Sequence, residues 1–228
     1  AEDSGAGAEA TLTFSGGNWI WKGATEEITE EYITAIEPDS WKLKTILSRA
    51  GETTTYNYDP TSGYLDEVLT SDGQKVSLIY NLHSQLGEIT VFDGENTTCR
   101  TRYGYVSSAD SRLTSVTVDL TPEDTSDSKQ YVTTYTYEGM SSRIETITQT
   151  DGTSVTFTYE QDGSDYKVKT LTDAQGDTVT FDYSNGVTTI TDAKGNTTSF
   201  HYDTQNRLTK TVGPLVGGRR STTTYTYD

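Results

Sequence analysis

Two stretches near the carboxyl end, DAQGDTVTFDYSNG at residues 173–186 and DAKGNTTSFHYDTQ at residues 192–205, follow one pattern. Threonine, aspartate, alanine, glycine, threonine, phenylalanine and tyrosine recur between them with an offset of nineteen positions. In the first copy a glycine turn leads into Val179, Phe181 and Tyr183, which alternate with polar residues. Alternation with a period of two predicts β-strands with one wet face, and the repetition predicts one structural unit used twice.

The same unit recurs along most of the chain as an apolar or aromatic residue, one intervening residue and a tyrosine. Successive tyrosines lie about 24 residues apart, an interval typical of repeat arrays. The pairs are Tyr56 and Tyr58, Leu78 and Tyr80, Tyr103 and Tyr105, Tyr135 and Tyr137, Phe157 and Tyr159, Phe181 and Tyr183, Phe200 and Tyr202, and Tyr225 and Tyr227.

Turn residues separate each pair from a stretch of β-branched residues that is expected to form a second strand. Asp72-Gly73, Asp93-Gly94 and Asn185-Gly186 are dipeptides that accept a positive φ in tight hairpins. One repeat is therefore expected to be one β-hairpin. The predicted fold is all-β and mostly antiparallel, with consecutive hairpins that form a curved, twisted sheet or partial shell.

Residues 1–40 interrupt the pattern and are expected to be a lead-in and a cap for the repeats of residues 41–228. Ile28, Tyr32 and Ile36 fit a helical stripe, so a short helix is one reading of this stretch. Residues 32–36 also read as a strand, and the strand-like residues that follow favour this second reading.

Composition restricts the partners. Only 32% of residues are hydrophobic, yet the chain has 16 tyrosines and 44 threonines, both of which favour strands. The net charge of −17 repels phosphate backbones and anionic lipid, so we expect neither nucleic-acid binding nor membrane insertion. Cys99 is the only cysteine, which excludes an intrachain disulfide.

The stretch GNTTSFHYDTQNRLTKTV at residues 195–212 resembles the YD repeat of the Rhs family. That repeat has a glycine, an aromatic-x-Tyr-Asp, a polar turn that ends in Gly/Asn-Arg-Leu, and an apolar strand. Tyr202, Asp203, Arg207 and Leu208 occupy these positions here.

Other copies depart from the pattern but keep its outline over residues 41–228. Residues 57–68 carry Tyr64 in place of the arginine, and Glu138 and Glu160 stand where the aspartate is expected. The residues expected to define the repeat structurally are Tyr58, Asp59, Tyr80, Tyr105, Tyr137, Phe157, Tyr159, Phe181, Tyr183, Phe200, Tyr202, Asp203, Arg207, Leu208, Tyr225, Tyr227 and Asp228.

The resemblance implies a ribbon of hairpins that spirals into a shell, as in bacterial Rhs toxins, the B and C components of insecticidal Tc complexes, and teneurins. Such a shell encloses a toxin domain or serves as a rigid extracellular body. The self-cleaving core motif of the toxin branch does not occur here, so no protease residue is carried over. Eight hairpins are fewer than a closed shell uses, and we expect the chain to be a fragment of a longer protein.

Trp19, Trp21 and Trp41 are the candidate ligand-binding residues. Exposed aromatic platforms are used by carbohydrate-binding and adhesin modules, which is the alternative to a scaffold. Trp19 and Trp21 share one strand face by the rule of alternation, and the favoured interpretation is that they cover the first hairpin.

No residue pattern indicates catalysis or a cofactor. His83 and His201 are the only histidines and lie far apart in sequence, and the aspartates sit in turns that they can cap. We expect no enzyme, metal or cofactor. The expected partners are further repeats or domains of the same protein, a cargo polypeptide, a polysaccharide under the alternative, and a second copy through free sheet edges. The expected location is secreted or on a bacterial cell surface.

Overall fold

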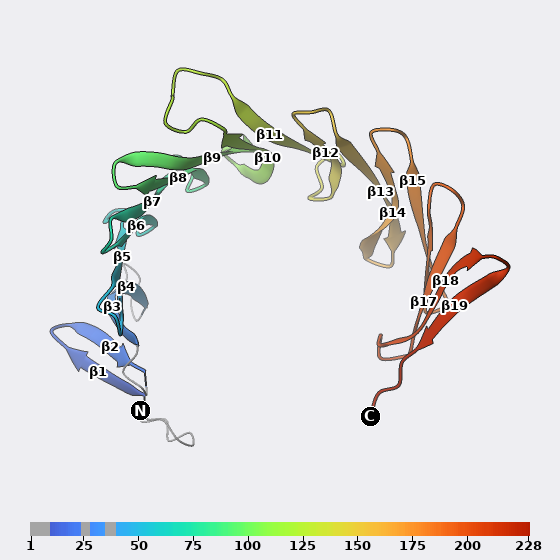
Figure 1. Ribbon diagram of the computed structural model, residues 1–228, viewed down its shortest axis with the longest axis horizontal. Coiled ribbons are helices and arrows are strands. Elements are labelled where there is room, and N and C mark those ends of the chain that lie inside the picture. Colours follow the sequence, from blue (N-terminus) through green and yellow to red (C-terminus); the bar gives the residue numbers. More distant parts are fainter. Residues whose placement is uncertain (1–9, 24–27, 35–39) are drawn as a thin grey trace. The chain divides into compact units, whose positions relative to one another are not determined.

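A computed structural model describes residues 10–23, 28–34 and 40–228 (Figure 1). The described residues form nineteen strands and no helix, which confirms the all-β prediction. The strands are β1 (Thr11–Ser15), β2 (Asn18–Lys22), β3 (Ile28–Thr34), β4 (Trp41–Ser48), β5 (Thr53–Tyr58), β6 (Leu65–Thr70), β7 (Gln74–Tyr80), β8 (Leu86–Asp93), β9 (Asn96–Ser107), β10 (Asp110–Asp119), β11 (Gln130–Tyr137), β12 (Ile144–Gln149), β13 (Ser154–Asp162), β14 (Asp165–Asp173), β15 (Thr178–Ser184), β16 (Val187–Thr191), β17 (Thr197–Tyr202), β18 (Leu208–Val216) and β19 (Arg219–Thr224).

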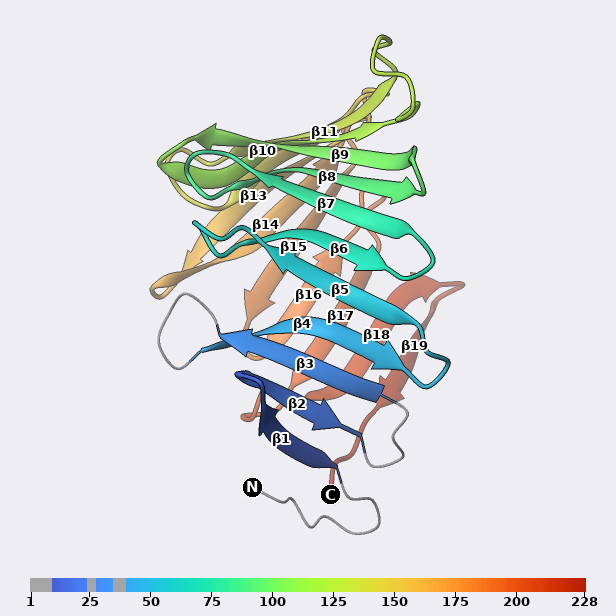
Figure 2. The ribbon, with the colours of Figure 1, turned by 90° about the vertical axis from the view of Figure 1, so that its left-hand side faces the viewer.

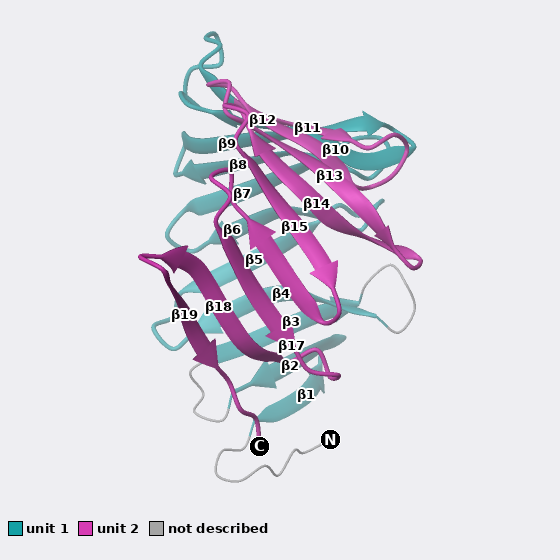
Figure 3. Cartoon of the chain, turned by 90° about the vertical axis from the view of Figure 1, so that its right-hand side faces the viewer, with its two compact units in different colours: residues 1–131 teal, residues 132–228 magenta. Residues whose placement is uncertain are grey.

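The chain divides into two compact units, residues 1–131 and residues 132–228 (Figure 3). In the first unit the strands from β1 to β10 lie side by side in chain order, and each pairs antiparallel with the next one along the chain (Figure 2). In the second unit the strands from β11 to β19 pair in the same sequential way. Each unit is therefore a ladder of consecutive hairpins, as the repeat predicts.

Each unit is a single layer of strands. Among the described residues no apolar side chain is fully buried, and Thr90, which is 5% exposed, is the one buried polar residue. Apolar side chains instead shield one another along the sheet face. Phe157 on β13 pairs with Leu171 on β14, which pairs with Val179 on β15. Cross-strand neighbours of this kind contribute roughly 0.2–1 kcal/mol each.

The opposite face of the second unit carries rows of threonine. One row crosses β11 to β15 and the other crosses β13 to β17. The rows are Thr136, Thr146, Thr156, Thr172 and Thr178, and Thr158, Thr170, Thr180, Thr191 and Thr197. Paired threonines bond to each other, with Oγ1 atoms 2.6 Å apart at Thr158 and Thr170 and 2.9 Å apart at Thr172 and Thr178. The high threonine content thus supplies a wet, β-branched face in place of an aliphatic core.

The helical reading of residues 28–36 is wrong where the structure describes them. Residues 28–34 form β3, in which Tyr32 lies opposite Trp19 of β2 on one side and Leu43 of β4 on the other. Pairing on both edges satisfies the backbone of β3, which outweighs the local helical spacing. Ile36 lies outside the described residues.

The final aromatic pair also departs from the hairpin pattern. Strand β19 ends at Thr224, and Tyr225 and Tyr227 lie beyond it. The backbone nitrogen of Tyr225 still donates a hydrogen bond to the carbonyl of Thr209, at 2.9 Å. This segment therefore follows the sheet edge without forming a regular ladder.

Candidate functional site

One irregularity recurs at a tyrosine at or near the end of the first strand of a hairpin. Tyr58 lies opposite Leu65, whereas the preceding Asn57 lies opposite Glu67, so Asp66 is an extra residue in β6. Such a bulge takes backbone groups next to it out of the regular ladder. The same one-residue shift occurs at Tyr32, Tyr80, Tyr105, Tyr137, Tyr159 and Tyr202.

The tyrosine of the next hairpin binds the carbonyl group beside such a bulge. The Tyr159 hydroxyl donates a hydrogen bond of 2.6 Å to the carbonyl oxygen of Ile144, and Glu145 is the extra residue of that bulge. The bond joins one hairpin to the hairpin before it. Equivalent bonds are Tyr58 to Leu43 at 2.8 Å, Tyr105 to Leu86 at 2.8 Å, Tyr183 to Val168 at 2.9 Å and Tyr227 to Leu208 at 2.7 Å.

A cation covers the ring in four of these five cases. It comes from the residue immediately before the carbonyl that the hydroxyl binds. The distances from the cation to the ring centroid are 4.8 Å for Lys42 and Tyr58, 5.9 Å for Arg143 and Tyr159, 5.1 Å for Lys167 and Tyr183, and 5.0 Å for Arg207 and Tyr227. We call this unit a clasp: the tyrosine, the carbonyl beside the bulge, and the residue that covers the ring.

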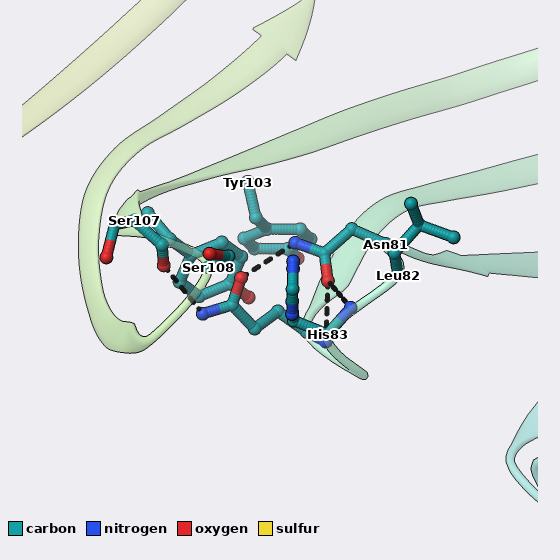
Figure 4. Close-up of a pocket in the computed structure, with 8 residues that line it drawn as sticks. Asn81, Leu82, His83, Tyr103, Ser107 and Ser108 are labelled. Carbon is teal, nitrogen blue, oxygen red and sulfur yellow. Dashed lines mark hydrogen bonds between the residues drawn. The ribbon is translucent and has the colours of Figure 1, made fainter.

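The fifth clasp replaces the cation by an amide. Gln85 precedes Leu86, and its Nε2 donates to the carbonyl oxygen of Ser107 at 3.2 Å. Figure 4 shows how Asn81 holds this turn, because its Oδ1 accepts hydrogen bonds from the backbone nitrogens of His83 and Gln85, at 2.9 and 3.1 Å. A shallow hollow of about 370 Å³ lies over this clasp.

Burial keeps the clasp tyrosines in the donating form. It raises the pKa of Tyr58, Tyr105, Tyr159 and Tyr183 above the ordinary 10.0 of a phenol. These hydroxyls are protonated at neutral pH, as an ordinary phenol is, and burial extends to higher pH the range in which they can donate to a carbonyl group.

The aspartate after the tyrosine shapes the turn and orients the cation. In Asp203, Oδ1 accepts hydrogen bonds from the backbone nitrogens of Gln205 and Arg207, at 2.8 and 3.0 Å. Its Oδ2 accepts from Arg207 Nε at 2.8 Å, which directs the guanidinium towards Tyr227. The backbone bonds, followed by the arginine, lower the pKa of Asp203.

The hairpin of β15 and β16 offers no carbonyl group to the tyrosine of the next hairpin, and its turn explains why. Asn185 and Gly186 both have positive φ, 54° and 71°, so a two-residue turn joins the strands without a bulge. No carbonyl is released for Tyr202, which is 38% exposed. The backbone nitrogen of Tyr202 donates to the carbonyl of Gly186 instead, at 2.9 Å.

The structure thus separates the predicted repeat-defining residues into groups. Tyr58, Tyr105, Tyr159, Tyr183 and Tyr227 form clasps, whereas Tyr80 and Tyr202 donate no hydroxyl hydrogen bond to any described residue. Phe157, Phe181 and Phe200 lie on the strands, Tyr137 lies at a bulge, and Asp228 is exposed. Sequence reasoning missed the cations Lys42, Arg143 and Lys167, although each directly precedes an apolar residue that begins or continues a second strand.

The candidate ligand-binding tryptophans are only partly brought together. Phe14, Trp19 and Trp41 form a cluster with ring centroids 5.2, 6.0 and 6.2 Å apart, packed at tilted or edge-on angles. Trp21 lies outside the cluster, and its ring lies beside Gly23. Sequence reasoning missed Phe14, whose alternation with Leu12 in β1 was the available signal.

The described residues contain no metal-binding cluster. Within residues 10–23, 28–34 and 40–228 no three histidine, cysteine or acidic side chains are placed to hold a metal ion. His201 contacts Ser199 at 3.3 Å, and His83 lies in an exposed turn. The same residues contain no apolar helix long enough to cross a bilayer.

Residues 183–215, which include the Tyr202–Leu208 turn, match the family model for the RHS Repeat. Residues 183–215 carry an RHS repeat. The match confirms the predicted resemblance to the Rhs and YD-repeat family. No curated protein matches the chain significantly.

Several solved structures are similar to the chain. The TcdB2-TccC3 structure has a TM-score of 0.44 and 13% identity, with 96% of this chain and 14% of that chain covered. A Tc holotoxin pore from Photorhabdus luminescens has a TM-score of 0.41 and 12% identity, with 96% and 15% covered. A porin-like protein from Bacteroides uniformis has a TM-score of 0.37 and 13% identity, with 98% and 90% covered. The chain spans about one seventh of the length of the toxin chains.

Proposed function

We propose that the chain is a scaffold, a segment of an RHS-repeat wall whose hairpins are locked to one another by clasps. The observation that supports this most strongly is the recurrence of the clasp in a sheet without any fully buried apolar side chain among its described residues. A lone hairpin is marginal in water, and a ladder gains stability from neighbour to neighbour. The clasp is a neighbour interaction of this kind.

In the complete protein, the wall encloses a cargo or toxin polypeptide or forms a rigid body on the bacterial surface or outside the cell. A continuous single layer of strands can divide one aqueous space from another. The wall acts without catalysis and without a cofactor. The charge of −17 disfavours nucleic acid and anionic membranes as partners.

The test uses the natural full-length protein that carries this segment, treated with a protease. An enclosed polypeptide stays uncut in the unmodified protein and becomes accessible when the clasps are removed by Tyr159→Ala and Tyr183→Ala together. Tyr202→Ala, at a position without a clasp, is the matched control. If no polypeptide is protected in the unmodified protein, enclosure is excluded and only the rigid-body role remains.

The cluster of Phe14, Trp19 and Trp41 supports a second candidate function, carbohydrate binding. Phe14 is 58% exposed and Trp41 is 37% exposed, and exposed aromatic rings can stack on sugars. Retardation in polysaccharide gels should then be lost with Trp41→Ala and kept with Trp21→Ala, because Trp21 lies outside the cluster. Equal mobility with and without polysaccharide would leave the cluster as a cap on the first hairpins.

A further inference from the structure

The position between the hairpins of Tyr58 and Tyr80 has the parts of a clasp but lacks the cation. Tyr64 occupies the place that Lys42, Arg143, Lys167 and Arg207 occupy elsewhere, directly before the apolar residue of a bulge. Its ring stacks on the Tyr80 ring, with centroids 5.0 Å apart and an interplanar angle of 26°. No cation from the described residues lies over Tyr80, and the Tyr64 ring stacks there instead.

Two carboxylates beside this ring pair have unused oxygens. All hydrogen bonds to Asp59 from Thr61 and Ser62 use Oδ1, so Oδ2 has no partner among the described residues. At the equivalent Asp203, Oδ2 is the atom that holds Arg207. The Oδ1 atom of Asp66 is inaccessible to water and has no hydrogen-bond partner.

A hollow of about 560 Å³ opens at this place. It is lined by Asp59, Asp66, Tyr64, Tyr80 and apolar side chains that include Leu82, which is 99% exposed. A buried polar atom without a partner is unfavourable, and a carboxylate oxygen is relieved most by a charged donor. The hollow therefore combines an uncovered aromatic face with acceptors that require a cation.

Lys42, the cation of the preceding clasp, is already engaged. Lys42 lies over the Tyr58 ring, its Nζ donates to the carbonyl oxygen of Gly63, and it does not line the hollow. Two clasps of the chain show that one guanidinium can bind a carboxylate and cover a tyrosine ring at the same time. Arg207 binds Asp203 and lies over Tyr227, and the Arg143 guanidinium binds Glu138 while it covers Tyr159.

We propose that this hollow binds an arginine side chain of a partner polypeptide. The guanidinium lies against the ring pair of Tyr64 and Tyr80 and donates to Asp59 Oδ2. The Asp66 carboxylate, which also lines the hollow, adds a second negative charge beside it. Arginine fits better than lysine because its planar group can stack on a ring while it donates to a carboxylate, as Arg207 does with Tyr227 and Asp203. The apolar side chains of the hollow contact the methylene stem of the arginine. The binding site is independent of whether the complete protein encloses a cargo.

The test is a titration of the chain with a short peptide that contains one arginine between glycines and has blocked ends. Chemical-shift changes are expected at residues 59–66 and at Tyr80. The same peptide with citrulline, which keeps the shape and loses the charge, should bind at least about tenfold more weakly. Raising the salt concentration should also weaken the binding of the arginine peptide, because salt screens its attraction to the carboxylates.

Two variants separate this site from general attraction to an acidic chain. Tyr64→Arg places the missing cation within the chain and should abolish binding while it raises the melting temperature. Asp66→Asn keeps the shape and should weaken binding about tenfold. Equal binding of the arginine and citrulline peptides, or undiminished binding to a folded Tyr64→Arg variant, would overturn the proposal.

Discussion

Removing one clasp hydroxyl tests the role of the clasps directly. Tyr159→Phe keeps the aromatic ring beneath Arg143 and deletes only the bond of 2.6 Å to the Ile144 carbonyl. One hydrogen bond of this kind contributes about 1 kcal/mol to the free energy of unfolding. For a chain of 228 residues this corresponds to a melting temperature lower by about 2–4 °C. Tyr159→Ala also removes the half-buried ring and should cost roughly 2–3 kcal/mol, less than a fully buried aromatic residue.

The matched control is Tyr202→Phe. Tyr202 ends the same kind of strand, but its hydroxyl bonds to no described residue, so this variant should change the free energy of unfolding by less than about 0.5 kcal/mol. Urea denaturation followed by circular dichroism gives both values. Equal losses in Tyr159→Phe and Tyr202→Phe would show that the hydroxyl bonds do not hold the hairpins together.

Three further predictions concern pH, the two-residue turn and the ring-covering cation. Folding raises the pKa of Tyr183 above 10.0, so the unfolded chain loses this proton at a lower pH than the folded chain. The free energy of unfolding therefore falls as pH rises from 10.0 through the higher folded pKa. In urea titrations between neutral pH and about pH 11, Tyr183→Phe should lose less stability than the unmodified chain. Gly186→Ala should lower the free energy of unfolding by about 1–2 kcal/mol, because Gly186 has a φ of 71°, which is strained for any residue with a Cβ. An unchanged midpoint in urea would contradict this. Arg207→Ala should lower the free energy of unfolding by about 0.5–1 kcal/mol, because it removes the cation over the Tyr227 ring. In a double-mutant cycle with Tyr227→Leu, the losses of the two single variants should be coupled. Additive losses would mean that the cation and the ring do not interact.

Much of the fold was predictable because strand alternation and turn chemistry are local properties. Phe181 and Tyr183 alternate with polar residues, and Asn185-Gly186 supplies the positive φ of the turn, so this hairpin could be inferred from adjacent residues alone. The stretch at residues 28–34 was ambiguous for the same reason. Its helical spacing is local, whereas the two strands that pair with Tyr32 are contributed by other parts of the chain.

The candidate site was less predictable than the fold. Tyr159 and Arg143 were visible as residue types, but the carbonyl of Ile144 has no sequence signature and becomes available only because Glu145 is an extra residue opposite Tyr137. A bulge depends on how two strands are aligned with each other. The cluster of aromatic rings in β1, β2 and β4 likewise depends on three strands that meet at one face.

The sequence by itself determined that this chain is an array of β-hairpins with an aromatic side, since the alternation of apolar and polar residues, the turn residues and the repetition are local properties of the sequence. Only the tertiary structure decided which hairpins are clasped, which ring lacks its cation and which carboxylate oxygens have no partner. The physical reason is that these features arise between strands. The hairpin before Tyr159 has a one-residue shift in strand alignment, beside which the Ile144 carbonyl is available, whereas the hairpin before Tyr202 has no such shift.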